Sequence, residues 1–70
     1  MAEYIANTVQ KMRTESGTTQ EELAERVGVS RQTIIAIERG RYTPSVLLAI
    51  KIAKHFRVPV EELFSIRHEK

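Results

Sequence analysis

The sequence predicts an all-α fold, one compact domain of five short helices spanning residues 1–70. Apolar residues recur along the chain at the three- and four-residue spacing of amphipathic helices. Serine or threonine residues that can cap helices precede several of these runs, and glycines follow them. Because 70 residues form only one thin core and every connection is short, we expect neighbouring helices to pack directly on one another.

The first helix is predicted from three apolar residues on one stripe, namely Ile5, Val9 and Met12. It is expected to end near Gly17, since glycine readily adopts the left-handed backbone that follows many helices. The segment Tyr4-Ile5 either lengthens this helix or forms a short extended arm.

The second and third helices have clear start and stop signals. The segment Thr19-Gln20-Glu21-Glu22 is a capping box, because the hydroxyl of Thr19 can accept from the Glu22 amide while the Glu22 side chain reaches back. The second helix stops at Gly28. Ser30 then caps a third helix, which Gly40 closes.

The fourth helix is the most apolar and runs from Val46 to about Phe56, with Ser45 or Thr43 as its cap. Pro59 breaks it, and a short fifth helix runs from Val60 to about Ser65. The core is expected to span about residues 7–65, whereas residues 66–70 are expected to fray. The inward residues of the second, third and fourth helices are Leu23, Ala24, Val27, Ile34, Ile37, Leu48, Ile52, Ala53 and Phe56.

Composition argues against several classes of protein. The chain has no cysteine, so it offers neither a disulfide nor a thiolate zinc site, and this fits the reducing cytoplasm where we expect the protein to be located. It has no aspartate, no glycine-rich phosphate loop and only two distant histidines, His55 and His68. We therefore expect no enzyme, no metal, no cofactor and no small-molecule ligand. No apolar run approaches the ~20 residues that span a bilayer, and the start lacks a signal peptide's basic and apolar blocks, so no membrane association is expected.

Positive charge is concentrated in one part of the chain. The formal net charge is only +2, yet residues 31–57 contain six arginines and lysines and a single acid, Glu38. A basic block inside a near-neutral chain favours a surface that binds a polyanion, although a solvated basic face has the same composition.

Residues 20–39 meet the geometric demands of a helix-turn-helix, in which two helices cross over a tight turn. Gly28 supplies the positive φ where the first helix of the motif ends, and Ala24 is small where the two helices touch. The outer face after the Ser30 cap is polar, since it begins Arg31-Gln32-Thr33. The angle between the helices is expected to be filled by Leu23, Val27, Val29, Ile34 and Ile37.

These residues resemble the Cro/CI (xenobiotic-response-element) class of helix-turn-helix regulators, which share a phage-repressor-like fold of five helices. The likeness lies in Thr19–Ala24, Val27–Ile34 and Ile37–Gly40, and it continues through Pro44-Ser45, Ile52–Lys54 and Val60–Phe64. It covers roughly residues 7–65. The resemblance implies a sequence-specific transcriptional regulator of double-stranded DNA, most simply a repressor.

The resemblance places the third helix in the major groove. It assigns base contacts to Arg31, Gln32, Thr33, Ile35 and Ala36, and phosphate contacts to Gln20, Ser30, Arg39, Arg41 and Tyr42. The chemistry of the first group agrees, because arginine binds guanine edges, glutamine binds adenine edges, and an aliphatic side chain can meet a thymine methyl. Ile35 could equally pack along the helix side, and Tyr42 could equally pack its ring over the turn.

Relatives in this class often bury an ion pair whose positions match Arg13 and Glu38 here, and we interpret it as structural. The sequence also departs from the family pattern. Thr18 replaces an aliphatic residue before the capping box, and Arg57 stands where a glycine commonly ends the fourth helix, which implies a left-handed arginine or a different helix end. Leu47 adds apolar surface outside the core.

Apolar residues in excess of what a small monomer can hide predict a symmetric homodimer. The predicted interface consists of Leu47, Ile50, Val60, Leu63, Phe64 and Ile66. The third helix of each subunit would then read one half-site of a palindromic operator, with the two half-sites about 34 Å apart. Alternatively, these residues complete the core of a monomer, or they bind a different protein, as in the antitoxin of a toxin–antitoxin pair. A non-specific architectural DNA protein is disfavoured by the modest net charge.

Overall fold

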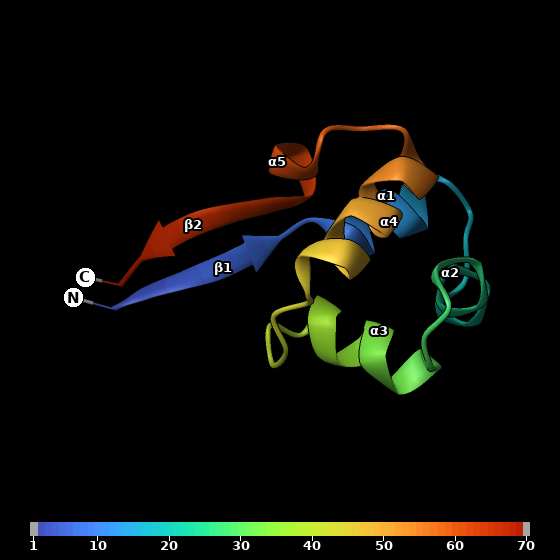
Figure 1. Cartoon of the computed structure of the whole chain (residues 1–70), viewed down its shortest axis with the longest axis horizontal. Coiled ribbons are helices and arrows are strands. Elements are labelled where there is room, and N and C mark those ends of the chain that lie inside the picture. The colour runs from blue at the N-terminus through green and yellow to red at the C-terminus, as the bar shows by residue number, and fades with distance from the viewer. Residues whose placement is uncertain (1, 70) are drawn as a thin grey trace.

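The computed structural model describes residues 2–69, in which helices form a globular body and a two-stranded ribbon projects from it (Figure 1). The helices correspond to the predicted ones, although the fifth is shorter than expected. In chain order the elements are β1 (Glu3–Asn7), α1 (Val9–Glu15), α2 (Gln20–Val27), α3 (Arg31–Glu38), α4 (Val46–Phe56), α5 (Val60–Leu63) and β2 (Phe64–His68).

Side-chain caps begin three of the helices, as the sequence predicts. The capping box of α2 is complete, since the Glu22 amide donates to the Thr19 hydroxyl at 3.0 Å and the Thr19 amide donates to Glu22 Oε1 at 2.9 Å. Ser30 caps α3. Ser45 rather than Thr43 caps α4, because the Leu48 amide donates to Ser45 Oγ at 3.1 Å.

Left-handed backbone occurs at the C-cap of two helices, and it follows the C-cap of α1 and α3 at Gly17 and Gly40. α2 ends at Gly28 with φ 77°, as expected of the residue that opens a tight turn. α4 ends at Arg57 with φ 60° and ψ 42°, so this arginine takes the conformation usually reserved for glycine. Arg57 is the one non-glycine residue with positive φ in the described part of the chain.

The core lies where α1, α2, α3, α4 and α5 meet, and every fully buried residue found between positions 2 and 69 is apolar. Phe56, predicted to face inward, is half-buried at its edge. The core consists of Val9, Leu23, Ala24, Val27, Ile34, Ile37, Leu48, Ile52, Ala53 and Leu63.

The junction between β1 and α1 is tied to two other elements. Asn7 Nδ2 donates to the Ile37 carbonyl at 2.8 Å, and Asn7 Oδ1 accepts from the Val9 amide at 3.2 Å. The Thr8 amide donates to the Leu63 carbonyl at 2.9 Å. The side chain of Asn7 therefore starts α1 and fixes it to the end of α3.

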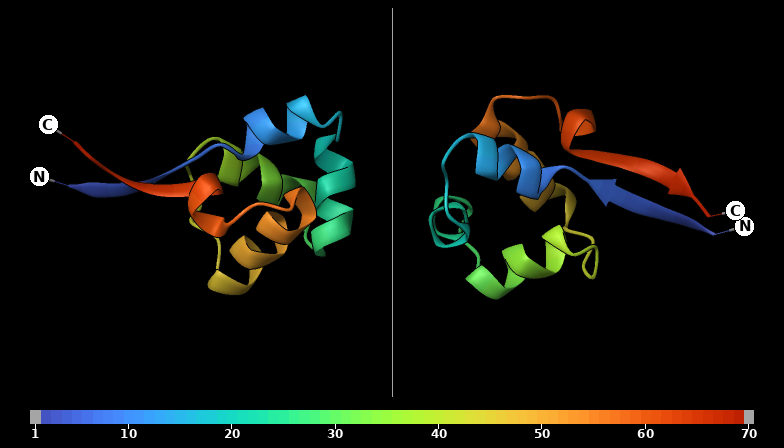
Figure 2. Two further views of the ribbon diagram at one scale, coloured as in Figure 1. Left: turned by 90° about the horizontal axis from the view of Figure 1, so that it is seen from above. Right: turned by 180° about the vertical axis from the view of Figure 1, so that it is seen from behind.

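The ribbon corrects the all-α prediction. β1 and β2 are antiparallel, with Tyr4 opposite Arg67 and Ile5 opposite Ile66, and Figure 2 shows the ribbon extending away from the helices in both views. Ile5 thus belongs to a strand rather than to the first helical stripe, and Tyr4-Ile5 is extended. α5 ends at Leu63 rather than near Ser65, because the chain becomes extended at Phe64.

The expectation that residues 66–70 fray is wrong as far as His68, which is the last residue of β2. Lys70 lies outside the described residues. Pairing with β1 explains why residues 64–68 form a strand, since the cross-strand hydrogen bonds satisfy backbone groups that would otherwise bind water.

Candidate nucleic-acid interface

The α2–turn–α3 segment has the geometry that a helix-turn-helix requires. The chain reverses through Gly28, and the Val29 amide then donates to the Ala24 carbonyl at 2.9 Å, which closes the end of α2. The inner faces of the two helices bury Leu23, Ala24, Val27, Ile34 and Ile37, so α3 packs firmly across α2. Val29, expected in the same angle, is half-buried against this core.

The outer flank of α3 presents the residues expected to read bases. Arg31 and Gln32 are exposed, whereas Thr33 in the same turn and Ile35 and Ala36 one turn further along are half-buried. The Thr33 hydroxyl lies 3.1 Å from Ser30 Oγ. The first turn of α3 thus offers a guanidinium and a carboxamide to solvent, followed by a small, partly apolar surface.

Residues expected to contact phosphates lie on both sides of this flank. Arg39, Arg41 and Tyr42 are exposed in the segment after α3, which is closed by the Arg41 amide donating to the Ala36 carbonyl at 2.9 Å. The Ser30 hydroxyl already serves as the α3 cap, since it accepts from the Thr33 amide at 3.3 Å. Gln20 begins α2 and is half-buried.

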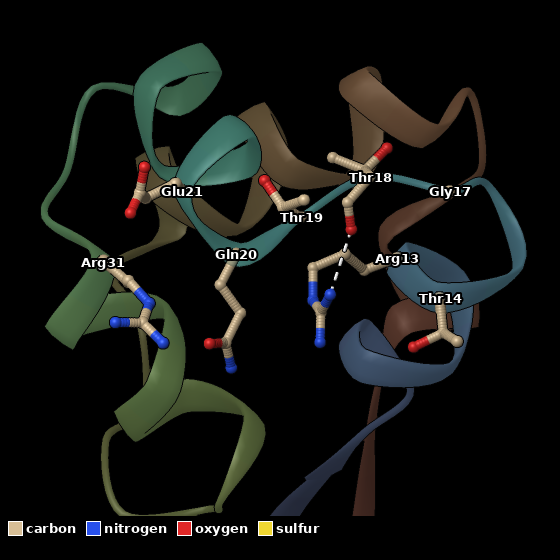
Figure 3. Close-up of a pocket in the computed structure, with 8 residues that line it drawn as sticks. All are labelled: Arg13, Thr14, Gly17, Thr18, Thr19, Gln20, Glu21 and Arg31. Atoms are coloured by element: carbon tan, nitrogen blue, oxygen red, sulfur yellow. Dashed lines mark hydrogen bonds between the residues drawn. The ribbon is translucent and has the colours of Figure 1, made fainter.

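An open hollow of about 690 Å³ separates the start of α3 from the α1–α2 connection. Figure 3 shows that the side chain of Gln20 points into it between the guanidinium groups of Arg13 and Arg31. The remaining lining residues are Thr14, Gly17, Thr18, Thr19 and Glu21. The lining carries two arginines and one acid, Glu21, and the exposed Arg31 together with the amide of Gln20 provides donors that suit an anionic backbone.

The ion pair expected between Arg13 and Glu38 is present and largely shielded from water. Arg13 Nε donates to Glu38 Oε2 at 2.6 Å, and the two side chains are 14% and 3% exposed respectively. Arg13 Nη1 also donates to the Thr18 carbonyl at 3.0 Å. Thr18, which replaces the aliphatic residue of the family pattern, therefore uses its backbone to hold this arginine.

The predicted dimer surface is only partly exposed. Leu63 is wrong as an interface residue, because it is 1% exposed and belongs to the core. Val60 and Phe64 are half-buried, whereas Leu47, Ile50 and Ile66 are exposed.

The structure adds five residues to this surface that sequence reasoning missed. They line an apolar groove of about 270 Å³ together with Ile50, Val60 and Phe64, and they are Ile5, Thr43, Pro44, Val46 and Ala49. Ile5 was missed because its partner in the sheet, Ile66, is distant in the sequence. The high exposure of Val46, 76%, was not readable from its place in an apolar helix.

Neither a metal-ion site nor a membrane-spanning helix is found among the residues that the structure describes. Between residues 2 and 69 there is no group of acids and histidines that could hold a metal ion. Within the same range no helix has the length and apolar character needed to traverse a lipid bilayer.

Two helices crossing over a glycine turn, with the second exposing polar groups after a serine cap, define a helix-turn-helix DNA-binding protein. The sequence pattern of the Helix-turn-helix family matches residues 9–63. The chain therefore belongs to the Cro/CI-type helix-turn-helix family of transcriptional regulators, which confirms the resemblance found in the sequence.

Individual relatives agree with this assignment. An uncharacterised HTH-type transcriptional regulator of Bacillus subtilis, YgzD, is 49% identical over 65 residues, covering 93% of this chain and 98% of its own. The cryptic phage CTXphi transcriptional repressor RstR of Vibrio cholerae is 35% identical, covering 87% of this chain and 55% of its own. The restriction-modification controller protein C.AhdI of Aeromonas hydrophila has a similar structure, with a TM-score of 0.72 at 30% identity, covering 77% of this chain and 82% of its own.

Proposed function

We propose that this regulator is a homodimeric repressor that reads a palindromic operator through α3. The observation that carries the proposal is the exposed start of α3, where Arg31 and Gln32 follow the Ser30 cap and no residue of the described chain covers them. An α-helix fits the major groove of B-DNA, and residues in its first turn reach the base edges. A regulator of this kind meets its DNA in the cytoplasm, where we therefore place the protein.

Arg31 and Gln32 are proposed to carry most of the sequence preference. A guanidinium can donate two hydrogen bonds to guanine O6 and N7, and a carboxamide can bind adenine N6 and N7. Thr33, Ile35 and Ala36 lie further along the same flank and would add hydroxyl and methyl contacts.

Backbone contacts are proposed on both sides of the groove. Arg39, Arg41 and Tyr42 would hold one strand, and Gln20 with the start of α2 would hold the other. Ser30 would contribute through its place at the start of α3 rather than through a free hydroxyl, because its Oγ is engaged as a cap. Such contacts fix the position of the protein without reading sequence.

The homodimer is proposed to form through the apolar groove and the residues around it. Leu47, Ile50 and Ile66 are 66%, 42% and 62% exposed, which is costly for a monomer of this size. The surface extends from α4 to the ribbon face that carries Ile5, so it spans the groove. Two-fold symmetry would place two α3 helices on half-sites about 34 Å apart.

The decisive experiment selects bound duplexes from a random pool and then compares Arg31→Ala with Arg41→Ala on the selected site. Arg31→Ala is expected to cost about 1–3 kcal/mol of binding and to relax the base preference at one position. Arg41→Ala is expected to weaken all duplexes alike and to reduce the salt slope by about 1. Equal losses on selected and random duplexes for both variants would contradict this division of roles.

The dimer has its own test. Sedimentation at tens of micromolar is expected to give about twice the chain mass of 8.0 kDa. Ile50→Glu should shift it to the monomer, since a carboxylate would be desolvated in the interface. The matched control is Lys51→Glu on the next, exposed position of α4, which should leave the dimer intact. A wild-type mass near 8.0 kDa would refute the proposed homodimer.

The same apolar groove favours one other candidate, a protein-interaction module such as an antitoxin that grips a toxin. This alternative expects a different polypeptide, rather than a second copy, to bind the surface. If a toxin co-purifies with the wild-type chain but not with Ile50→Glu, the antitoxin is favoured. A stable homodimer that binds DNA would favour the repressor.

A further inference from the structure

The last residue of α3, Glu38, contacts the first residue of α2, Gln20, through a hydrogen bond that the buried ion pair does not require. Glu38 Oε1 accepts from Gln20 Nε2 at 3.0 Å, while Glu38 Oε2 accepts from Arg13 Nε at 2.6 Å. Arg13 Nη2 is 3.4 Å from Oε1. One carboxylate thus holds an arginine from α1 and an amide from α2 at the same time.

The chemistry of this contact decides which end of the Gln20 amide faces which way. An ionised carboxylate has only acceptors, so the NH₂ group and not the carbonyl of Gln20 must turn toward Glu38. That nitrogen carries a second N–H, which remains for another acceptor. A free glutamine could rotate its amide and present the carbonyl oxygen instead, which would repel an anion.

The amide of Gln20 lies at the open hollow beside α3. Gln20 lines the open hollow between Arg13 and Arg31 (Figure 3), and its amide nitrogen donates to Glu38, which is not among the residues that line the hollow. A bare carboxylate so close to a DNA backbone would be repulsive. Arg13 cancels that charge, because it pairs with Glu38 while contributing to the same hollow.

We propose that Glu38 is a positioning residue for DNA binding, which orients the Gln20 amide so that its second N–H donates to a backbone phosphate in this hollow. Arg13 allows a carboxylate to do so next to a polyanion. This role rests on the proposed DNA-binding function and deepens it. The ion pair is then part of the binding device as well as of the fold.

The test is a double-mutant cycle on affinity for the selected duplex, with Gln20→Ala, Glu38→Gln and both together. Glu38→Gln retains the side-chain size but can offer Gln20 either a donor or an acceptor, so the orientation is lost. It is expected to weaken binding about tenfold in the wild-type background and to have almost no effect in the Gln20→Ala background. In the Arg41→Ala background, the matched control, the tenfold loss should persist because the hydrogen-bond partners of Glu38 in the described chain are Arg13 and Gln20.

The outcomes separate the possibilities. A loss that is equal in all three backgrounds means that Glu38 acts only through general stability, and it overturns the positioning role. No loss from Glu38→Gln overturns it as well. A wild-type protein that binds no duplex refutes the proposed function itself, which is a different result from a folded, DNA-binding protein without coupling.

Glu38→Gln could fail to fold, because it leaves Arg13 without a charged partner. The wild-type protein then provides the measurement, through the two side-chain N–H resonances of Gln20 during titration with the selected duplex. One proton is expected to shift strongly on binding while the other keeps its hydrogen bond to Glu38. If neither proton responds to the duplex, the proposal is overturned.

Discussion

Arg57→Gly is expected to raise the free energy of unfolding, although glycine usually weakens a helix. Arg57 adopts φ 60° and ψ 42°, which costs a residue with a Cβ roughly 1–2 kcal/mol. Glycine avoids this cost but loses about 0.5–1 kcal/mol more backbone freedom on folding. The exposed Arg57 side chain makes no hydrogen bond within the described chain, so little else is lost. The midpoints of these two ranges differ by a gain of about 0.75 kcal/mol.

Urea denaturation followed by circular dichroism measures this gain, and thermal unfolding should show a rise of about 2–8 °C. Arg57→Ala is the matched control, because it removes the same side chain but retains the Cβ, and it should stay within about 0.5 kcal/mol of wild type. Gly28→Ala is the reverse substitution at φ 77°, where an added Cβ meets no atom within 4 Å, so it should lose about 1 kcal/mol through the backbone alone. If Arg57→Ala stabilises as much as Arg57→Gly, left-handed strain is not the cause.

Three further substitutions test the core, the strand–helix junction and acid sensitivity. Ile52→Ala should lower the unfolding free energy by about 2–5 kcal/mol, since the side chain is fully buried; a loss under about 1 kcal/mol in urea titration would contradict the packing. Asn7→Ala should cost about 1–3 kcal/mol because it removes two hydrogen bonds, one to the Ile37 carbonyl and one from the Val9 amide, and hydrogen exchange should show faster opening of α1. The pKa of Glu22 is lowered mainly by the backbone N–H of Thr19, so its stabilisation is present above the ordinary glutamate pKa and is lost as the pH falls through the lowered value. Glu22→Gln should therefore differ from wild type at neutral pH and converge with it in acid, and a difference independent of pH would refute this account.

The helical part of the fold could be predicted because its signals are local. Thr19, Ser30 and Ser45 each accept from the amide of the third residue of the next helix, and Gly28 supplies the one backbone conformation that the motif needs. Each of these interactions spans a few residues, so the sequence displays both partners together. The same holds for the exposed polar start of α3.

The ribbon could not be predicted in this way, because each strand is stable only through a partner at the other end of the chain. Ile5 lies at helical spacing from Val9, and nothing near it indicates that it faces Ile66. The error propagated to the candidate site, since the groove that Ile5 lines was not foreseen. Leu63 was misplaced for a related reason, because apolar character alone does not tell a core residue from an interface residue.

The contact between Gln20 and Glu38 also lay beyond local reasoning. The two residues were assigned to different tasks, one to phosphate binding and the other to a structural pair. Only the crossing of α2 and α3 brings the first residue of one helix within 3.0 Å of the last side chain of the other.

Joining β1 to β2 has a consequence for biosynthesis. Residues 3–7 are synthesised before the five helices, and their partners at 64–68 are synthesised after them. The α2–α3 unit of a nascent chain can therefore form while Ile5 has no partner strand. The sheet can form completely only after translation has passed position 68. A chain that terminates a few residues before that point would retain the α2–α3 unit, but the backbone of β1 would lack part of its partner strand.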